Sequence, residues 1–392
     1  MEYFKEQLEL IKSKDQYRSL KYIQTSQDPE VMIEGKKYII FGSNNYLGLC
    51  NDVRLKESAI NAIKQYGVGS GGSRLTTGSY DVHKKLEKKI AEFKGTEDSL
   101  VFNSGYAANV GIISAVCNRD WVIFSDRYNH ASIIDGCILS RAKLIRYKHC
   151  DMEDLKDKIL KYKGKHNLIV TDGVFSMDGD IAPIPKIVEI AKKNNILTMV
   201  DDAHATGVLG KGGRGTASFF NLENQIDISM GTLSKAVASE GAYAAGSHEF
   251  IEYLKNKARS LIYSTSLSPA VINVSIKSLE IIEKEDFRRN DLLNMSLWLQ
   301  KKLKELGFNI IETVTPIIPV IIGDSKTTLQ FSNMLMEEGI YVPGIRPPTV
   351  PNGTARLRIS LMATHKIEQL QQALSKIEFI GRKLGIIGDK HE

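Results

Sequence analysis

Between about Asn45 and Ser266, short β-branched runs alternate with helical patterns, and this alternation constrains the fold more than any other feature. The runs NLIVTD (167–172) and ILTMVDD (196–202) are typical of buried strands. Between them, PIPKIVEIAKKNN places its apolar residues at helical spacing, which makes a β-α-β unit. Further strands are expected at 99–102, 121–126 and 143–147. Several such units in series predict an α/β fold, with a mostly parallel sheet covered by helices.

The pattern changes after about residue 270. An amphipathic helix at about 285–306 precedes the strand-like segments NIIETVTPIIPVIIGD and ARLRISL, with further helices between and after them. At the other end, residues 1–25 read as an amphipathic helix that leads into a strand. We therefore predict an N-terminal helix and strand segment (1–45), a large α/β domain (46–270) and a smaller α+β domain (271–392).

Composition excludes several classes of protein. The net charge of +6 is spread over 392 residues, and no basic block alternates with aromatic residues, so we expect no nucleic-acid partner. The chain has neither an apolar run of about 18 residues for a membrane span nor the apolar core of a signal peptide. Its cysteines lack metal-ligand spacing, so we expect reduced thiols, mostly in the core, no metal and a cytoplasmic location. They are Cys50, Cys117, Cys137 and Cys150.

Two glycine loops resemble dinucleotide fingerprints only superficially. The G-x-G-x-x-G patterns that begin at Gly67 and Gly210 lack the required strand before them and helix after them. A nicotinamide-dependent dehydrogenase is therefore disfavoured.

The segment IDISMGTLSKAVASEGAY (226–243) contains an unusual lysine. Lys235 follows a β-rich run, stands beside the hydroxyls of Thr232 and Ser234, and precedes small residues. A lysine shielded from water has a lowered pKa, and its neutral amine can form a Schiff base. Pyridoxal 5′-phosphate (PLP) would also need a carboxylate at its ring nitrogen, a flat partner against its ring, and donors for its phosphate and phenolate.

The sequence offers a candidate for each requirement. Asp201 ends a strand, and His204 follows three residues later. His130 and Ser176 each lie just beyond another strand. The strand-to-helix turn in FNSGYAAN offers free N–H groups to a phosphate. Each residue alone has an ordinary structural explanation, but all of them follow sheet strands in one α/β segment, which favours a shared site.

The remaining histidines that we considered lie in polar segments, and we expect them to be solvated. They are His83, His149, His166, His248 and His391.

The motifs VDDAHATGVLGKGGRGT, GTLSKA, NHASIIDG and TDGVFSMDGDIAPI resemble those of the α-oxoamine synthases. The resemblance extends from about Tyr17 to Ile387. It implies a fold-type I PLP-dependent transferase (aspartate-aminotransferase-like), in which 46–270 is the PLP-binding domain. It also implies a homodimer with shared active sites, and an enzyme that condenses an amino acid with an acyl-CoA and loses CO2.

The resemblance assigns roles residue by residue. Lys235 is similar to the Schiff-base lysine that also serves as acid and base, Asp201 to the partner of the ring nitrogen, and His204 to the partner of the phenolate oxygen. His130 resembles the residue that stacks on the ring and positions the acyl group. Arg358 resembles the clamp for the substrate carboxylate. The remaining cofactor contacts are Gly105, Tyr106, Ser176, Thr232 and Thr265, the last reaching the phosphate of the neighbouring subunit.

Some motifs point to particular substrates. DQYRSL, with Arg18 as an acyl contact, IRPPTVPNGTARLR, with Thr349 as a substrate contact, and GSGGSRLTTGS resemble members that join L-alanine to pimeloyl-CoA or a pimeloyl carrier protein in biotin biosynthesis. The product would be 8-amino-7-oxononanoate. In contrast, YNHASIIDG and FSMDGDIA are closer to members that join glycine to acetyl-CoA, and SKAVASEGAY departs from the Gly-Lys-Ala-x-Gly pattern. A fold-type I aminotransferase and a non-catalytic PLP-binding module are more distant alternatives.

Overall fold

The computed structural model describes residues 2–14 and 16–388. By internal packing the chain forms two compact units. The sheet unit comprises Leu47–Ser176 and Ile181–Asn290, and the terminal unit comprises the residues up to Tyr46, Met177–Asp180 and those from Asp291 onward. The domain boundaries predicted at 45/46 and 270/271 stay a prediction.

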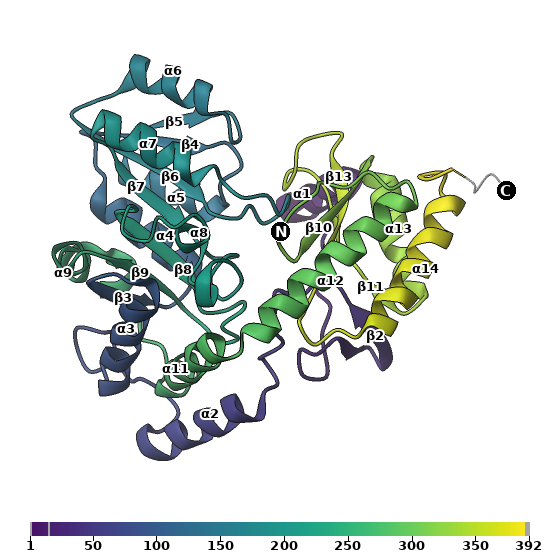
Figure 1. The fold of residues 1–392 in the computed structure, drawn as a ribbon, viewed down its shortest axis with the longest axis horizontal. Helices are drawn as coiled ribbons and strands as arrows, with labels where there is room; N and C mark the ends of the chain where they lie inside the picture. The colour runs from purple at the N-terminus through teal and green to yellow at the C-terminus, as the bar shows by residue number, and fades with distance from the viewer. Residues whose placement is uncertain (1, 15, 389–392) are drawn as a thin grey trace. The chain divides into compact units, whose positions relative to one another are not determined.

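The sheet unit is built on a seven-stranded sheet in the order β3-β9-β8-β7-β6-β4-β5. Strand β9 is antiparallel to its neighbours β3 and β8, and the pairs from β8 to β5 are parallel (Figure 1). This arrangement brings the carboxyl ends of strands far apart in sequence to one edge. The strands are β3 (Asp98–Phe102), β4 (Trp121–Asp126), β5 (Lys143–Tyr147), β6 (His166–Asp172), β7 (Leu197–Asp201), β8 (Ile228–Thr232) and β9 (Ala242–Gly246).

Helices cover both faces of this sheet, as the strand sequences require. Ile123 of β4 packs with residues of α4 and α5, whereas Val122 and Phe124 pack with α6 and α7 on the other face. The predicted α/β fold with a mostly parallel sheet is therefore confirmed. The helices are α2 (Val53–Tyr66), α3 (Asp81–Lys94), α4 (Gly105–Val116), α5 (Ala131–Ser140), α6 (Met152–Tyr162), α7 (Ile184–Asn194), the 3-10 turn Lys211–Gly213, α8 (Thr216–Phe219), α9 (His248–Lys257), α10 (Arg259–Ile262) and α11 (Pro269–Lys284).

The terminal unit contains two three-stranded sheets, ordered β1-β2-β11 and β10-β13-β12. In the first sheet, the C-terminal strand β11 pairs with the N-terminal strand β2. N-terminal and C-terminal segments therefore share this unit. Its strands are β1 (Glu30–Ile33), β2 (Lys36–Ile40), β10 (Ile317–Gly323), β11 (Ile340–Tyr341), β12 (Gly344–Ile345) and β13 (Ala355–Ser360). Its helices are α1 (Glu2–Ser13), α13 (Ser325–Glu337) and α14 (Ile367–Lys383), and α12 (Asp286–Glu305) begins in the sheet unit and continues into the terminal unit.

The predicted N-terminal helix over residues 1–25 is wrong in length. Helix α1 ends at Ser13 and has no buried residue, so packing does not extend it. Farther along, Ile23 pairs in antiparallel fashion with Ile33, which requires extended backbone. Tertiary pairing thus overrides the helical pattern in this segment.

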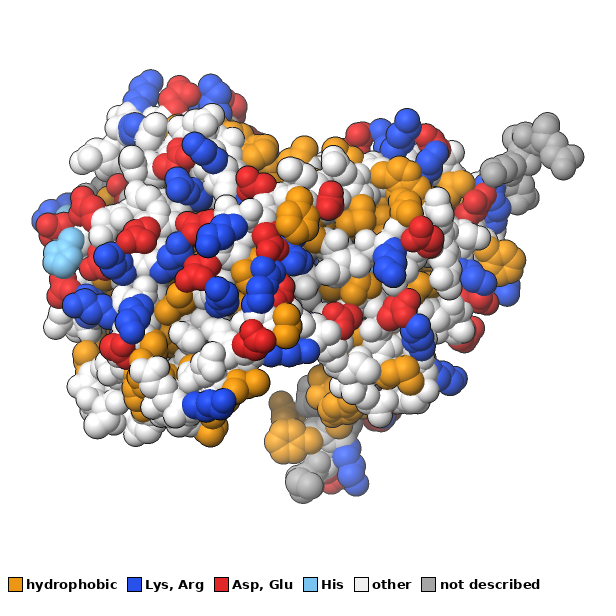
Figure 2. All heavy atoms as spheres, turned by 60° about the horizontal axis from the view of Figure 1, so that its bottom comes forward, with side chains coloured by type: hydrophobic (Ala, Val, Ile, Leu, Met, Phe, Trp, Pro, Cys, Tyr) orange, Lys and Arg blue, Asp and Glu red, His pale blue; other side chains and the backbone are white. Residues whose placement is uncertain are grey.

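Charged residues of both signs are mixed on the surface, as the small net charge of +6 over 392 residues suggests. Figure 2 shows Lys and Arg side chains interspersed with Asp and Glu on the face in view. Among the described residues, no helix has both the length and the apolar character needed to cross a bilayer.

A buried histidine joins the two ends of the chain in the terminal unit. His365 Nε2 lies 3.0 Å from the carbonyl oxygen of Ile40, and its Nδ1 accepts from the backbone N–H of Met362 at 2.8 Å. Its ring also stacks on Phe41, with centroids 4.8 Å apart. Burial lowers the pKa of His365 to about 4. The neutral tautomer satisfies both ring nitrogens, whereas a second ring proton would face the N–H of Met362.

This arrangement predicts that acid destabilises the protein. Between pH 6.5 and about 4 the unfolded chain binds a proton at His365 that the folded chain does not bind, so the free energy of unfolding falls as pH falls. Urea unfolding at pH 7, 6 and 5 measures this slope. His365→Gln should reduce it by about 1 kcal/mol per pH unit below pH 6.5. Equal slopes for the two proteins would contradict the assignment.

Candidate active site

The carboxyl edge of the sheet gathers the predicted cofactor residues of the sheet unit. Register pairs Asp172 at the end of β6 with Asp201 at the end of β7, and Asp201 with Met230 of β8. A cavity of about 230 Å3 opens at this edge. It is lined by Gly105, Tyr106, Asn109, His130, Ser132, Asp172, Ser176, Asp201, Ala203, His204, Met230, Thr232, Ser234 and Lys235.

Lys235 lies in this cavity, in the turn that follows β8. Its Nζ is 2.9 Å from Nε2 of His204, and the residue is half-buried. Backbone hydrogen bonds hold the turn, from Leu233 N to Gly241 O and from Ala238 N to Lys235 O. Gly231 must be glycine here, because a Cβ would lie 2.4 Å from the hydroxyl of Tyr243. Close packing against Tyr243 thus requires a small residue at this position near the lysine.

Lys94 is a fully buried lysine of the sheet unit and contrasts with the half-buried Lys235. Lys94 Nζ is 2.8 Å from Oδ2 of Asp202 and is fully enclosed with it. Burial opposes its charge, but Asp202 and Tyr243 raise the pKa of Lys94 above its ordinary value. Lys94 therefore stays a charged member of an ion pair, whereas Lys235 Nζ contacts an imidazole nitrogen.

Asp201 is a buried carboxylate held by two donors. Its Oδ2 accepts from Asn109 Nδ2 at 2.7 Å, and its Oδ1 accepts from the N–H of Ala203 at 2.9 Å. Burial raises the pKa of Asp201, while Asn109 and Lys235 act in the opposite direction. A cation at the ring nitrogen of a bound cofactor would add to the stabilisation of this carboxylate.

A hydrogen-bonded chain leads from Asp201 to His130. Asn109 Nδ2 also donates to Ser132 Oγ at 2.9 Å, and Ser132 Oγ lies 2.7 Å from Nδ1 of His130. The N–H of Ser132 points to the same Nδ1 at 3.3 Å, so that nitrogen is an acceptor and the neutral ring carries its proton on Nε2. Burial lowers the pKa of His130, which favours this neutral form.

Asp172 is a second buried carboxyl group in the cavity. Its Oδ2 accepts from the N–H of His130 at 2.8 Å, which fixes the start of α5. Burial, and then the neighbouring Asp201, raise the pKa of Asp172 well above its ordinary value. Two carboxyl groups in register at one buried edge thus favour a protonated Asp172 beside an ionised Asp201.

Donors for a phosphate lie at the start of α4. Ser104 caps this helix by accepting from the N–H of Ala107 at 3.1 Å. The N–H groups of Gly105 and Tyr106 belong to the first turn and have no acceptor within the helix. Thr232 adds a hydroxyl, which lies 2.7 Å from that of Ser234. Anions are favoured at such a helix end.

These residues fit PLP. The cavity combines an amine, a buried carboxylate, two imidazoles, hydroxyls and helix N–H groups. In addition, the buried Oδ1 of Asn109 has no hydrogen-bond partner within the described part of the chain. The site is therefore polar in the manner that a phosphorylated, charged aromatic ring requires.

The structure does not bring every predicted residue into this cavity. Thr265 is exposed and does not line it; its carbonyl accepts from Asn103 Nδ2, and it bridges to Ser73. Arg18, Thr349 and Arg358 belong to the terminal unit. Within that unit, Arg18 Nη2 lies 3.4 Å from Thr349 Oγ1 across 331 positions of sequence, so the two predicted substrate contacts lie together.

Arg358 is buried in the central strand of a terminal-unit sheet. Its Nη1 donates to Ser360 Oγ at 2.7 Å, and its Nη2 lies 3.3 Å from Asn44 Oδ1 and 3.4 Å from the hydroxyl of Tyr46. These contacts fix the plane of the guanidinium within the terminal unit.

The prediction that five histidines are solvated is partly wrong. His83 is buried, with Nε2 2.9 Å from Ser266 Oγ, because it closes the first turn of α3 against the chain near residue 266. His149 is also largely buried, against Asp126. His166 and His248 are exposed as predicted, and His391 lies outside the described residues.

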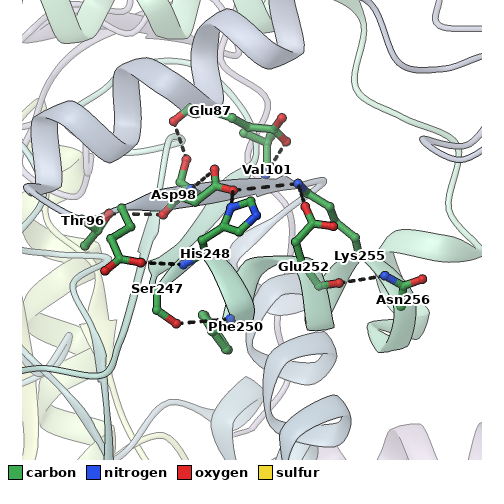
Figure 3. Close-up of polar contacts among 12 residues, drawn as sticks. Glu87, Thr96, Asp98, Val101, Ser247, His248, Phe250, Glu252, Lys255 and Asn256 are labelled. Carbon is green, nitrogen blue, oxygen red and sulfur yellow. Dashed lines mark hydrogen bonds and ion pairs between the residues drawn. The ribbon is translucent and has the colours of Figure 1, made fainter.

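The cluster around His248 is a surface ion-pair network. Lys255 Nζ lies 3.9 Å from Asp98 Oδ2 and 2.5 Å from Glu252 Oε1. Figure 3 shows it between the two carboxylates, with His248 beside Asp98. Lys255 thus links two carboxylates in an exposed ion-pair network.

Comparisons with known proteins agree with this geometry. The model of the family "Aminotransferase class I and II" matches residues 36–377. A putative 8-amino-7-oxononanoate synthase of Acetivibrio thermocellus is 54% identical over 98% of this chain and 99% of its own length. The 8-amino-7-oxononanoate synthase of Lysinibacillus sphaericus is 52% identical over 98% of this chain and 99% of its own.

Solved structures give the same result. A serine palmitoyltransferase from S. paucimobilis with a bound PLP–myriocin aldimine superposes with a TM-score of 0.93 and 32% identity, over 98% of both chains. The 8-amino-7-oxononanoate synthase from Francisella tularensis does so with a TM-score of 0.78 and 32% identity, over 88% of this chain and 98% of that one. The fold is that of the fold-type I PLP-dependent transferases. The chain belongs to the aminotransferase class I and II family and, within it, to the α-oxoamine synthases, as its motifs predict.

Sequence reasoning missed three polar residues of the cavity: Asn109, Ser132 and Asp172. Asp172 ends a predicted strand beside Asp201, and this shared position was the available signal. Asn109 is a polar residue on an otherwise apolar helix face, which is a weaker signal.

Asn109 provides a test of this geometry. Asn109→Ala removes a hydrogen bond to a buried carboxylate, so the dissociation constant of PLP should rise about 10- to 100-fold. Spectrophotometric titration of the PLP-free protein with PLP measures this change. Asn167→Ala is the matched control, because Asn167 is also buried but its side chain bonds to Gly164, at the opposite end of β6. Equal PLP affinity in the two variants would refute the role of Asn109.

Proposed function

We propose that this chain catalyses the condensation of L-alanine with a pimeloyl thioester, with loss of CO2, to give 8-amino-7-oxononanoate in biotin biosynthesis. The observation that carries the proposal is the pairing of Lys235 Nζ with His204 Nε2, 2.9 Å apart, in the cavity that also holds the buried Asp201. The relatives of about half-identical sequence and full length, which bear the name 8-amino-7-oxononanoate synthase, support this choice of substrates.

PLP, when bound, supplies an electron sink for the negative charge that develops at the α-carbon of the amino acid. Lys235 Nζ takes the α-proton and later returns it, and its half-buried position lets it do both. Asp201 holds a proton at the ring nitrogen, which strengthens that sink. His204 orients the amine of Lys235 and donates toward the phenolate position.

His130 acts on the thioester. Since its Nδ1 accepts from Ser132, its Nε2–H is available as a donor to the acyl carbonyl oxygen, where negative charge develops during attack. The same ring offers a flat face to the cofactor. Gly105, Tyr106, Ser176 and Thr232 contact the cofactor ring and its phosphate.

The terminal unit supplies substrate recognition in this proposal. Arg358 binds the carboxylate of the amino acid, because a planar guanidinium suits bidentate contact with a carboxylate. Arg18 and Thr349 contact the acyl substrate, and their 3.4 Å approach makes them a pair. Thr265 reaches the phosphate of a neighbouring subunit, so the working form is a homodimer, and we place it in the cytoplasm.

The choice of substrates separates this proposal from its rivals. The holoenzyme should release free CoA, measured by chromatography, when mixed with L-alanine and pimeloyl-CoA, or free carrier thiol with the pimeloyl carrier protein. Glycine with acetyl-CoA should give at least tenfold slower release. We expect this preference because relatives of about half-identical sequence are named 8-amino-7-oxononanoate synthase, and because the proposed acyl contacts Arg18 and Thr349 lie 3.4 Å apart.

Three outcomes would overturn the proposal. Faster release with glycine and acetyl-CoA would make the chain a glycine C-acetyltransferase. Keto acid formed from alanine without any thioester would make it an aminotransferase. Absence of thiol release with every pair, in protein that retains PLP, would remove the synthase activity altogether.

A further inference from the structure

A second cluster of chemically reactive side chains lies beside the cofactor cavity. It comprises Asp126 at the end of β4 and the adjacent pair His149 and Cys150 after β5. His149 Nδ1 is 3.0 Å from Asp126 Oδ1, and Cys150 Sγ is 3.7 Å from His149 Nε2. The thiol of Cys150, the imidazole of His149 and the carboxylate of Asp126 thus form a hydrogen-bonded chain.

The donors around Asp126 determine how the imidazole is protonated. Asp126 is buried; its Oδ1 accepts from the N–H of Tyr128 at 2.8 Å, and its Oδ2 accepts from the N–H of Cys150 at 2.8 Å. Both oxygens of Asp126 thus act as acceptors, so Nδ1 of His149, 3.0 Å from Oδ1, is the donor in this contact. The lone pair of the neutral ring is then on Nε2, the atom that faces the thiol.

Packing holds this geometry in place. The ring of His149 is stacked on Tyr128, with centroids 4.4 Å apart, and meets Phe175 edge-on at 4.4 Å. Cys150 has a φ of 52°, in the left-handed region that residues other than glycine seldom adopt, and its N–H bond to Asp126 keeps it there. The imidazole cannot rotate away from the thiol without breaking these contacts.

The other titratable groups that face the cluster are Tyr147 on β5, Asp172 on β6 and the phenol of Tyr128. Burial, and then Asp126, raise the pKa of Tyr147 well above its ordinary value, so its phenol stays neutral. Burial and the neighbouring Asp201, with a smaller contribution from Asp126, raise the pKa of Asp172, so it tends to stay protonated. Among these side chains, Asp126 is the one that contacts Nδ1 of His149 directly.

A metal centre explains these contacts less well. Both oxygens of Asp126 already accept N–H bonds, and the ring nitrogen nearest to it is itself a donor. A thiol is activated when a base lies beside it and a third residue orients that base, which is the arrangement seen here.

The four cysteines differ in the way this interpretation requires. Burial raises the pKa of Cys137 to about 12 and that of Cys117 further, so neither forms a thiolate near neutral pH. Cys50 is exposed, and Cys150 is partly exposed. The thiols of Cys50 and Cys150 are therefore accessible to a reagent in solution. The sulfur of Cys150 also lies beside the imidazole of His149.

We propose that Cys150 is a reactive thiol, activated by His149 and oriented through Asp126, and that it is a site of modification by low-molecular-weight disulfides. His149 Nε2 takes the thiol proton, and the sulfur attacks one sulfur of the disulfide. A new S–S bond forms at Cys150 as the old S–S bond breaks, and the other half leaves as a thiolate that accepts a proton from solvent. No net oxidation occurs, because one disulfide replaces another.

The test uses the holoenzyme and the neutral probe 2-hydroxyethyl disulfide, with each adduct located by peptide mass spectrometry. In the wild-type protein, the pH at which Cys150 is modified at half its maximal rate should be at least one unit lower than the corresponding pH for Cys50. His149→Gln should slow Cys150 at least tenfold at pH 7 and leave Cys50 unchanged. Cys150→Ser should abolish that adduct alone.

The wild-type profile decides the matter even where a variant fails to fold. Coincident pH profiles for Cys150 and Cys50 would overturn the proposal, as would an unchanged rate in folded His149→Gln protein. Stoichiometric zinc in the purified enzyme, with Cys150 modified only after a chelator is added, would replace the reactive thiol with a metal centre.

Discussion

A carboxylate buried at the end of a parallel strand must be stabilised by its surroundings, and much of the cavity follows from this requirement at Asp201. Removing a charge from water is costly unless donors surround it. Asn109, from α4, and the N–H of Ala203 supply donors, and Lys235 lies in the same cavity. Asn109 in turn fixes Ser132, which fixes the tautomer of His130. One buried charge thus orders groups from two helices and a strand edge.

The sheet topology makes this concentration of groups possible. Asp172, Asp201 and Thr232 end three consecutive strands of the sheet, β6, β7 and β8, so residues up to 60 positions apart in sequence lie along one sheet edge. Small residues such as Gly231 then allow the turn with Lys235 to pack closely against this edge. In the terminal unit, Arg358 is held in place by Ser360 Oγ of β13 and by Asn44 Oδ1.

Much of the sheet unit could be predicted from sequence, for a local reason. Strand periodicity and strand ends are local patterns, and Asp201, His204 and Lys235 stand directly beyond such ends, so their shared edge follows from parallel topology. Asn109 and Ser132 could not be found in this way, because their importance arises from the packing of α4 against α5 and appears only in three dimensions. The early end of α1 and the burial of His83 and His149 likewise depend on tertiary partners that no local window contains.

Lys235, rather than any other lysine, is expected to bond to the cofactor. Reducing the holoenzyme with borohydride and mapping the pyridoxyl group by peptide mass spectrometry tests it directly. We expect one modified residue, Lys235, since Lys94 is held in its ion pair with Asp202. A pyridoxyl group on Lys94 or on any other lysine would contradict it.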